Sequence, residues 1–207
     1  MTKASSRTAS QIIADAESAL RMAQLGLEAV KRNSPGAKAV GLRNVAVFGR
    51  SVTWVLQNLR NTMPKQFDHW YAPHADEMRS DPLIRFFVVL RNQIEKQGLT
   101  PPSSSTEFEA KKDLTLPNDL GPPPPGAESF FLDVGGAGWN VSIGSETQRF
   151  YVELPEDKVI MRTYISNAPT THKGKPLGRR SMEELCELYV GDLQDLVADA
   201  KSNLPVV

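Results

Sequence analysis

The feature that most constrains the fold is a change in the spacing of apolar residues along the chain. Before residue 99 they recur every three or four positions, as they do along one face of an α-helix. After residue 128 they alternate with polar residues, as in half-buried β-strands. Residues 99–128 between these regions are rich in proline and include the run Pro122–Pro125. The pattern predicts an α+β protein with a helical bundle (8–98), a Pro-rich linker (99–128), and a small antiparallel sheet with a C-terminal helix (129–207).

Four helices are predicted before residue 99, enough for a compact bundle. The clearest covers Ser10 to Arg32, where one apolar stripe contains Ile13, Ala16, Leu20, Ala23, Leu27 and Val30. A second is expected from Ala37 to Asn61. Its apolar residues surround most of the circumference, which places it centrally, and Gly41 and Gly49 would let a neighbouring helix approach closely.

The other two predicted helices of the bundle are shorter. One, from Phe67 to Met78, is expected to be short or kinked because it contains Pro73. The next has strong boundary signals, since Asp81 can cap its N-terminus, Pro82 suits its first position, and Gly98 suits its C-terminal stop.

The second half of the chain reads as a β-meander followed by an amphipathic helix. The predicted strands are residues 129–134, 139–143, 149–154 and 159–165, and their short connections favour antiparallel pairing. Within the linker, Glu107 to Leu116 could form an exposed strand. The last helix, Ser181 to Asn203, starts with a capping box and has one apolar and one acidic face. We expect it to touch both the sheet and the bundle.

Charge and cysteine content exclude several classes of protein. The chain has 24 basic and 24 acidic residues, but its first 100 residues have 14 basic against 8 acidic ones. This basic half could attract nucleic acid or the acidic half of its own chain, and the second interpretation is favoured. The single Cys186 excludes a disulfide scaffold and a cysteine-ligated metal site. Because no apolar run suits a signal peptide or a membrane span, we expect a cytoplasmic protein that does not bind membranes.

The segment from Asp81 to Gly98 is an apolar helix that ends in Arg91-Asn92 and follows a long helical pair. In this it resembles the HEPN superfamily of helical-bundle domains, over about residues 10–98. The resemblance implies a homodimer that is either a metal-independent RNase or a non-catalytic domain of a toxin–antitoxin, defence or RNA-processing system. The family motif adds a histidine a few residues after the Arg–polar pair. Here Gln97, Gly98 and Leu99 stand there instead, which argues against RNase activity.

The loop from Ser166 to Arg180 offers a second group of candidate residues. Its basic side chains could contact phosphates, or Arg179 and Arg180 could pair with Glu183 and Glu184 of the last helix. The candidate nucleic-acid-binding residues are therefore Arg91, Asn92, His172, Lys173, Lys175, Arg179 and Arg180. His69 and His74 lack the spacing of a metal pair and are read as surface or capping residues.

The sequence favours a non-catalytic HEPN-like interaction or binding module in a defence or regulatory system. No catalytic residue, metal or cofactor is assigned. The expected partner is another protein or a second copy of the chain, most simply a homodimer, with RNA or a nucleotide as further candidates. Two alternatives stay open: a metal-independent endoribonuclease that uses Arg91 and Asn92, and a sensor of a small ligand or nucleotide bound between bundle and sheet.

Overall fold

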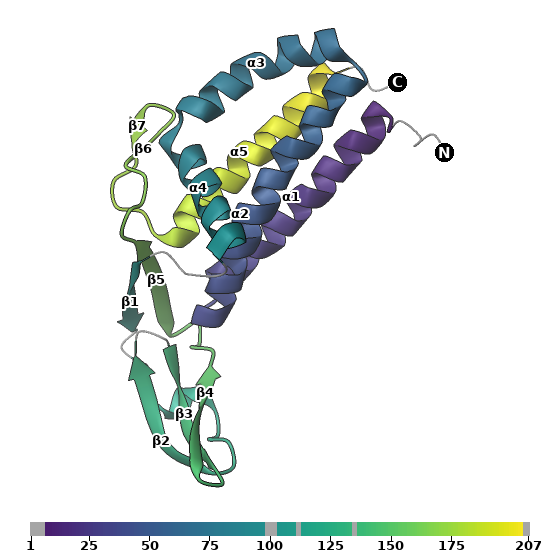
Figure 1. Cartoon of the computed structure of the whole chain (residues 1–207). Helices are drawn as coiled ribbons and strands as arrows, with labels where there is room; N and C mark the ends of the chain where they lie inside the picture. Colours follow the sequence, from purple (N-terminus) through teal and green to yellow (C-terminus); the bar gives the residue numbers. More distant parts are fainter. Residues whose placement is uncertain (1–6, 98–102, 111–112, 134–135, 205–207) are drawn as a thin grey trace, which may run out of the picture.

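Helices α1 (Ala9–Lys31) and α2 (Pro35–Gln57) form an antiparallel pair at one side of the bundle (Figure 1). The structure is a computed structural model and describes residues 7–97, 103–110, 113–133 and 136–204. The two helices are close where they cross, because a Cβ atom at Gly41 would lie 2.5 Å from the carbonyl oxygen of Gly26. The predicted close approach at Gly41 is therefore confirmed.

Helix α5 (Met182–Asn203) packs along this pair and completes the bundle. Its Tyr189 ring stacks on Phe87, with centroids 4.1 Å apart, and reaches α2 at Gly49, where a Cβ atom would lie 2.5 Å from the ring. The predicted capping box of Ser181 and Glu184 is present. Because α5 contacts all four other helices and also the strand β5 (Val159–Ile165), the expectation that it touches both halves is confirmed.

The second and third predicted helices are present with shifted ends, and the fourth begins at Pro82 as predicted. The predicted second helix ends earlier, at Gln57, and its last turn is the 3₁₀ helix η1 (Asn58–Asn61). Helix α3 (Pro64–Ser80) runs through Pro73, and α4 (Pro82–Gln97) follows it. Asp81 caps α4 as predicted, since its Oδ1 atom accepts hydrogen bonds from the N–H groups of Leu83 (2.8 Å) and Ile84 (3.2 Å). The predicted stop at Gly98 lies outside the described residues.

The strands form three separate antiparallel sheets rather than one meander. Strands β2 (Ala127–Asp133), β3 (Gly136–Ile143) and β4 (Glu146–Val152) pair in that order. The fourth predicted strand, β5, leaves this sheet and pairs with β1 (Ser104–Ala110). Two short strands, β6 (Thr171–His172) and β7 (Lys175–Pro176), form a hairpin before α5. The prediction of a four-stranded meander was therefore wrong at its last strand.

Strand β5 leaves the three-stranded sheet because it is bound to the helical bundle. The Asn33 side chain, at the end of α1, donates to the Val159 carbonyl (2.5 Å) and accepts from the Met161 N–H (3.2 Å). These bonds hold β5 against the helices, where β1 can reach it. The segment predicted as a linker (99–128) contains β1, which overlaps the strand expected at Glu107 to Leu116 but begins earlier, and the short helix η2 (Asn118–Leu120).

The three-stranded sheet, which we call the arm, extends away from one end of the bundle (Figure 1). Where the arm begins, a small second core contains Ala137, Leu154 and Val159, with Leu114 and Leu120 packed against it. The larger core lies between the helices. None of the helices in the described ranges combines the length and apolar character that a membrane crossing requires.

Candidate functional site

The two residues that carry the HEPN resemblance lie together near the end of α4. The Arg91 guanidinium stacks on Trp54 of α2, 4.2 Å from the ring centroid, and forms an ion pair with Glu95 at 2.5 Å. Its Nη1 atom also donates to Asn92 Oδ1 at 3.0 Å. With 16% of its side chain exposed, Arg91 is occupied in fastening α4 to α2.

The histidines of the chain lie elsewhere. His172 contacts Asp81 at the start of α4, ten residues before Arg91 and so about 15 Å away along the helix axis. His74 lies on α3, where its Nε2 atom is 2.9 Å from Asp199 Oδ2. His69 is also on α3 and is exposed. Within the described residues, no contact brings a histidine to Arg91.

His172 and Lys173 turn inward from the β6–β7 hairpin toward two carboxylates. His172 lies between Asp81 (Nδ1 to Oδ2, 3.1 Å) and Asp192 of α5 (Nε2 to Oδ2, 3.4 Å). The Lys173 N–H donates to Asp81 Oδ2 at 2.6 Å, and its Nζ atom is 2.6 Å from Asp192 Oδ1. The hairpin thus clamps the start of α4 to α5.

The two carboxyl groups of this cluster respond to it in opposite directions. Burial alone raises the pKa of Asp81, but the hydrogen bonds from the Lys173 N–H, His172 and the Ile84 N–H outweigh it, so the pKa lies below its ordinary value. Burial dominates at Asp192, whose pKa lies above the ordinary value although Lys173 opposes the shift. The cluster therefore favours the charged form of Asp81, whereas burial disfavours the charged form of Asp192.

The remaining basic residues of the loop lie at the surface. Arg180 pairs with Glu184 (2.8 Å), as one interpretation of the sequence predicted. Arg179 instead pairs with Glu107 of β1 (2.5 Å) and stacks on Tyr164, 3.8 Å from the ring centroid. Lys175 is exposed and has no acidic partner among the described residues. The loop therefore ties its neighbours together, and nucleic-acid binding by these residues stays a prediction.

His74 belongs to a small polar contact between α3 and α5. The Trp70 Nε1–H donates to Asp199 Oδ2 at 2.6 Å, and that bond, followed by the one with His74, keeps the pKa of Asp199 below its ordinary value. Across the described part of the chain, no group of three or more His, Cys, Asp or Glu residues has an arrangement that could hold a metal ion. These residues thus join two helices.

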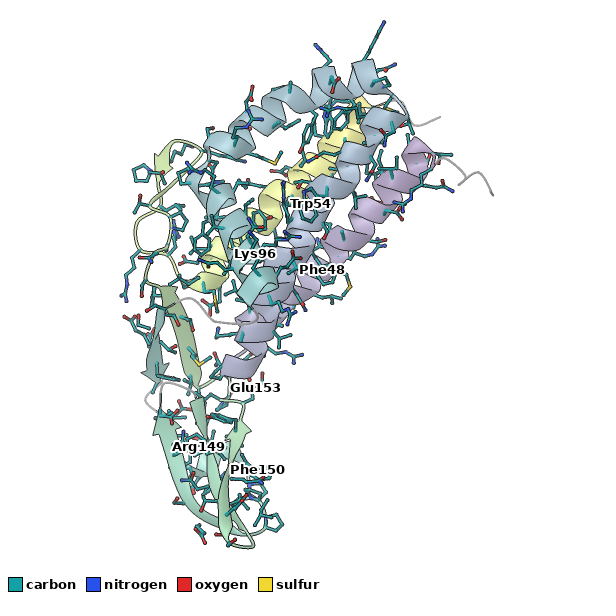
Figure 2. The ribbon with its side chains drawn as sticks, viewed as in Figure 1. Phe48, Trp54, Lys96, Arg149, Phe150 and Glu153 are labelled. Carbon is teal, nitrogen blue, oxygen red and sulfur yellow. The ribbon has the colours of Figure 1, made fainter. Side chains whose placement is uncertain are left out.

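The arm offers a surface that sequence reasoning missed. Strand β4 is exposed from Glu146 to Tyr151, and Phe150 and Tyr151 have 44% and 54% of their surface accessible. Figure 2 shows Arg149 and Phe150 on this part of the arm, and Glu153 where the chain leaves β4 toward the bundle. In the described ranges no strand pairs with the outer edge of β4. Alternation in the sequence predicted the strand, but it carried no signal for which edge would stay open.

The face of the arm that contains Arg149 has an ordered aromatic cluster. Phe131 and Tyr151 meet edge to face with centroids 5.3 Å apart, and the Arg149 guanidinium lies 4.7 Å from the Phe131 ring centroid. Arg149 also pairs with Asp133 at 2.6 Å. Between these rings is Gly138, where a Cβ atom would lie only 2.9 Å from Phe131. The cluster holds the side chains of β4 in a defined arrangement.

The fold and these surfaces define an α+β protein whose helical bundle carries a β-sheet arm with an open edge. Residues 34–109, less than half of the chain, match the family model described as bacteriophage lambda protein ea47. The matched region contains α2, η1, α3, α4 and nearly all of β1, so the similarity lies mainly in the helical half. No curated protein matches the chain. No solved structure matches it.

Proposed function

We propose that the chain is a non-catalytic interaction module, HEPN-like in its helical half, that forms a homodimer through strand β4 of the arm. The observation that carries the proposal is the open edge of β4, which is exposed on both faces of the sheet. An edge strand of this kind presents unpaired N–H and C=O groups that another strand can bind. Strand β2, at the other edge, is less suitable because Phe130, Phe131 and Asp133 are half-buried.

The hydrogen-bonding groups at this edge follow from the hairpin geometry. Strands β3 and β4 are joined by the two-residue turn Gly144–Ser145, and Ile143 pairs with Glu146. In such a hairpin the residues next to the turn bond to each other, and the pairs alternate from there. The N–H groups of Thr147, Arg149 and Tyr151 therefore point outward, away from β3.

Charge complementarity favours a second copy of the chain as the partner. When Tyr151 lies on the two-fold axis of an antiparallel pair, Arg149 of each copy is opposite Glu153 of the other. The outward N–H groups of Arg149 and Tyr151 then meet outward carbonyl groups of the second copy. The Arg149 guanidinium has five N–H donors, so it can bind this carboxylate and keep its pair with Asp133.

The match of residues 34–109 to the bacteriophage lambda ea47 family model bears on the biological system in which this module acts. A role in a defence or regulatory system connected with phages is consistent with that similarity. The endoribonuclease alternative has less support, because it requires a general base beside Arg91 and the histidines are placed elsewhere.

A charge-swap experiment tests the proposed dimer. Arg149→Glu alone places like charges opposite each other and should shift the protein toward monomer in sedimentation equilibrium. The double variant with Arg149→Glu and Glu153→Arg restores opposite charges and should recover the dimer, although it cannot recover the pair with Asp133. The matched control Arg162→Glu removes a comparable surface pair, with Glu109, outside the arm. A monomeric wild type, or a double variant no more dimeric than Arg149→Glu, would contradict the proposal.

A further inference from the structure

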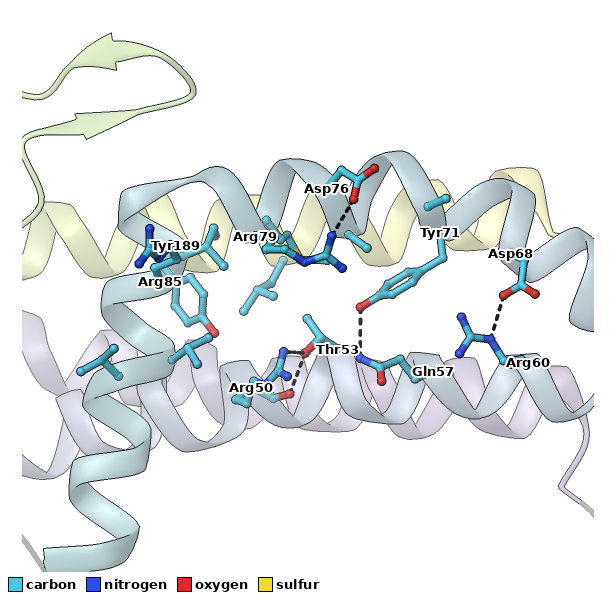
Figure 3. A pocket seen from close by; sticks show the side chains of 17 residues that line it. Arg50, Thr53, Gln57, Arg60, Asp68, Tyr71, Asp76, Arg79, Arg85 and Tyr189 are labelled. Carbon is cyan, nitrogen blue, oxygen red and sulfur yellow. Dashed lines mark hydrogen bonds and ion pairs between the residues drawn. The ribbon is translucent and has the colours of Figure 1, made fainter.

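A groove lies between α2 and α3, and α4 closes one end of it (Figure 3). It exists because α3 contacts η1 near one end and α4 at the other, and stands away from α2 between these ends. Its volume is about 800 Å³, which lies in the range of small-molecule binding sites. Tyr189 and Leu193 of α5 form its floor.

The charged lining of the groove has more arginines than aspartates, although Arg60 is paired with Asp68 at 2.7 Å. It contains four arginines (Arg50, Arg60, Arg79 and Arg85) and two acidic residues (Asp68 and Asp76). Arg50 donates to Thr53 Oγ1 at 2.9 Å and has no carboxylate partner among the described residues. Arg79 lies on the opposite wall, and Figure 3 shows both side chains directed into the space between α2 and α3.

The acidic partner of Arg79 can be replaced at little cost. Asp76 and Arg79 are neighbours on α3, and their 2.8 Å pair has about three quarters of each side chain exposed. Ion pairs this exposed contribute little to stability. An incoming anion could therefore take the place of Asp76 and bind Arg79 and Arg50 together.

Most of the rest of the lining is apolar. Ile84, Val88 and Val89 of α4 face the groove together with Ala75, Met78 and Leu193, so an apolar body could be buried beside the arginines. Across the groove, Gln57 of α2 donates to the Tyr71 hydroxyl of α3 at 3.2 Å and links the two walls at this point. A guanidinium is suited to the phosphate group because its planar fork can make two parallel hydrogen bonds.

We infer that this groove is a binding site for a small phosphate monoester with an apolar body. Arg50 and Arg79 hold the phosphate from opposite walls, and the body lies on Ile84, Val88 and Leu193. The site is separate from the arm, so it does not depend on the proposed dimer. Its ligand is expected to stabilise the bundle, since it bridges α2 and α3.

Isothermal titration calorimetry with 1-naphthyl phosphate tests this inference, with inorganic phosphate and 1-naphthol as half-ligands. The wild type should bind 1-naphthyl phosphate more tightly than either half. Arg50→Gln and Arg79→Gln should each weaken binding by about tenfold or more, as expected when a charge-assisted contact is lost. Asp76→Asn should strengthen binding, because it removes the carboxylate that competes for Arg79.

The control variant is Arg21→Gln on α1, which changes an exposed arginine outside the groove and should leave the affinity unchanged. Thermal unfolding of each variant without ligand checks that it is folded. An absence of binding to the folded wild type would overturn the inference. So would an unchanged affinity in a folded Arg50→Gln or Arg79→Gln variant, or equal weakening in Arg21→Gln.

Discussion

Asp81 joins two segments of the chain, the start of α4 and the β6–β7 hairpin, through one carboxylate. One oxygen caps α4, and the other accepts bonds from His172 and the Lys173 N–H. The carboxylate is buried and each of its contacts favours the charged form over the neutral one. Loss of the charge should therefore loosen both the helix start and the hairpin.

The pKa of Asp81 lies below its ordinary value in the folded chain, so folding favours the ionised form. This contribution is present above the unfolded-state pKa of about 4 and is lost as the pH falls through the folded-state pKa. We expect Asp81→Asn to lower the free energy of unfolding by roughly 2–3 kcal/mol near neutral pH. Urea unfolding at neutral and acidic pH checks this, because the difference from wild type should shrink in acid. A difference that is the same at both pH values would contradict it.

The crossing of α1 and α2 makes a prediction at the scale of helices. A Cβ atom at Gly41 would meet backbone atoms of Gly26 and Val30 at 2.5 and 2.6 Å, so the helices would have to move apart. Gly41→Ala should lower stability by about 1–3 kcal/mol although alanine favours helix. The control Gly191→Ala in α5 has open space around it and should raise stability by about 0.5–1 kcal/mol. Thermal unfolding measures both, and changes of the same sign would contradict the account of the crossing.

Elements with local signals could be predicted from the sequence. The cap at Asp81 and the capping box of Ser181 and Glu184 depend on residues within one helical turn, and both are present. The partner of β5 could not be predicted in this way. That choice depends on Asn33, which reaches Val159 across more than a hundred residues of chain. Local alternation identifies a strand, whereas a distant contact decides its sheet.

The candidate surfaces were harder to predict than the elements. The motif singles out Arg91 and Asn92 as candidate residues. It does not predict that Arg91 stacks on Trp54, because Trp54 belongs to a different helix. The groove is similar, because Arg50 and Arg79 belong to different helices and meet only in the folded bundle. The outer edge of β4 is open because β5 pairs with β1 and not with β4. Each surface is therefore a product of packing between distant segments.

At the scale of the whole molecule, the two charged halves of the chain neutralise each other. Lys31 of α1 pairs with Glu187 of α5 at 3.1 Å, and Lys38 of α2 pairs with Glu183 of α5. The expectation that the acidic helix attracts the basic half is confirmed by these contacts. Both pairs fasten α5 to the α1–α2 pair, whereas the arm and the groove lie apart from them.

Amide hydrogen exchange of β4, followed residue by residue by NMR at low and high protein concentration, tests the proposed dimer most directly. The N–H groups of Gln148 and Phe150 point toward β3 and should be protected at both concentrations. Those of Arg149 and Tyr151 point outward and should become protected only at the high concentration, where a second copy covers them. Equal exchange of Arg149 and Tyr151 at both concentrations would contradict pairing through this edge.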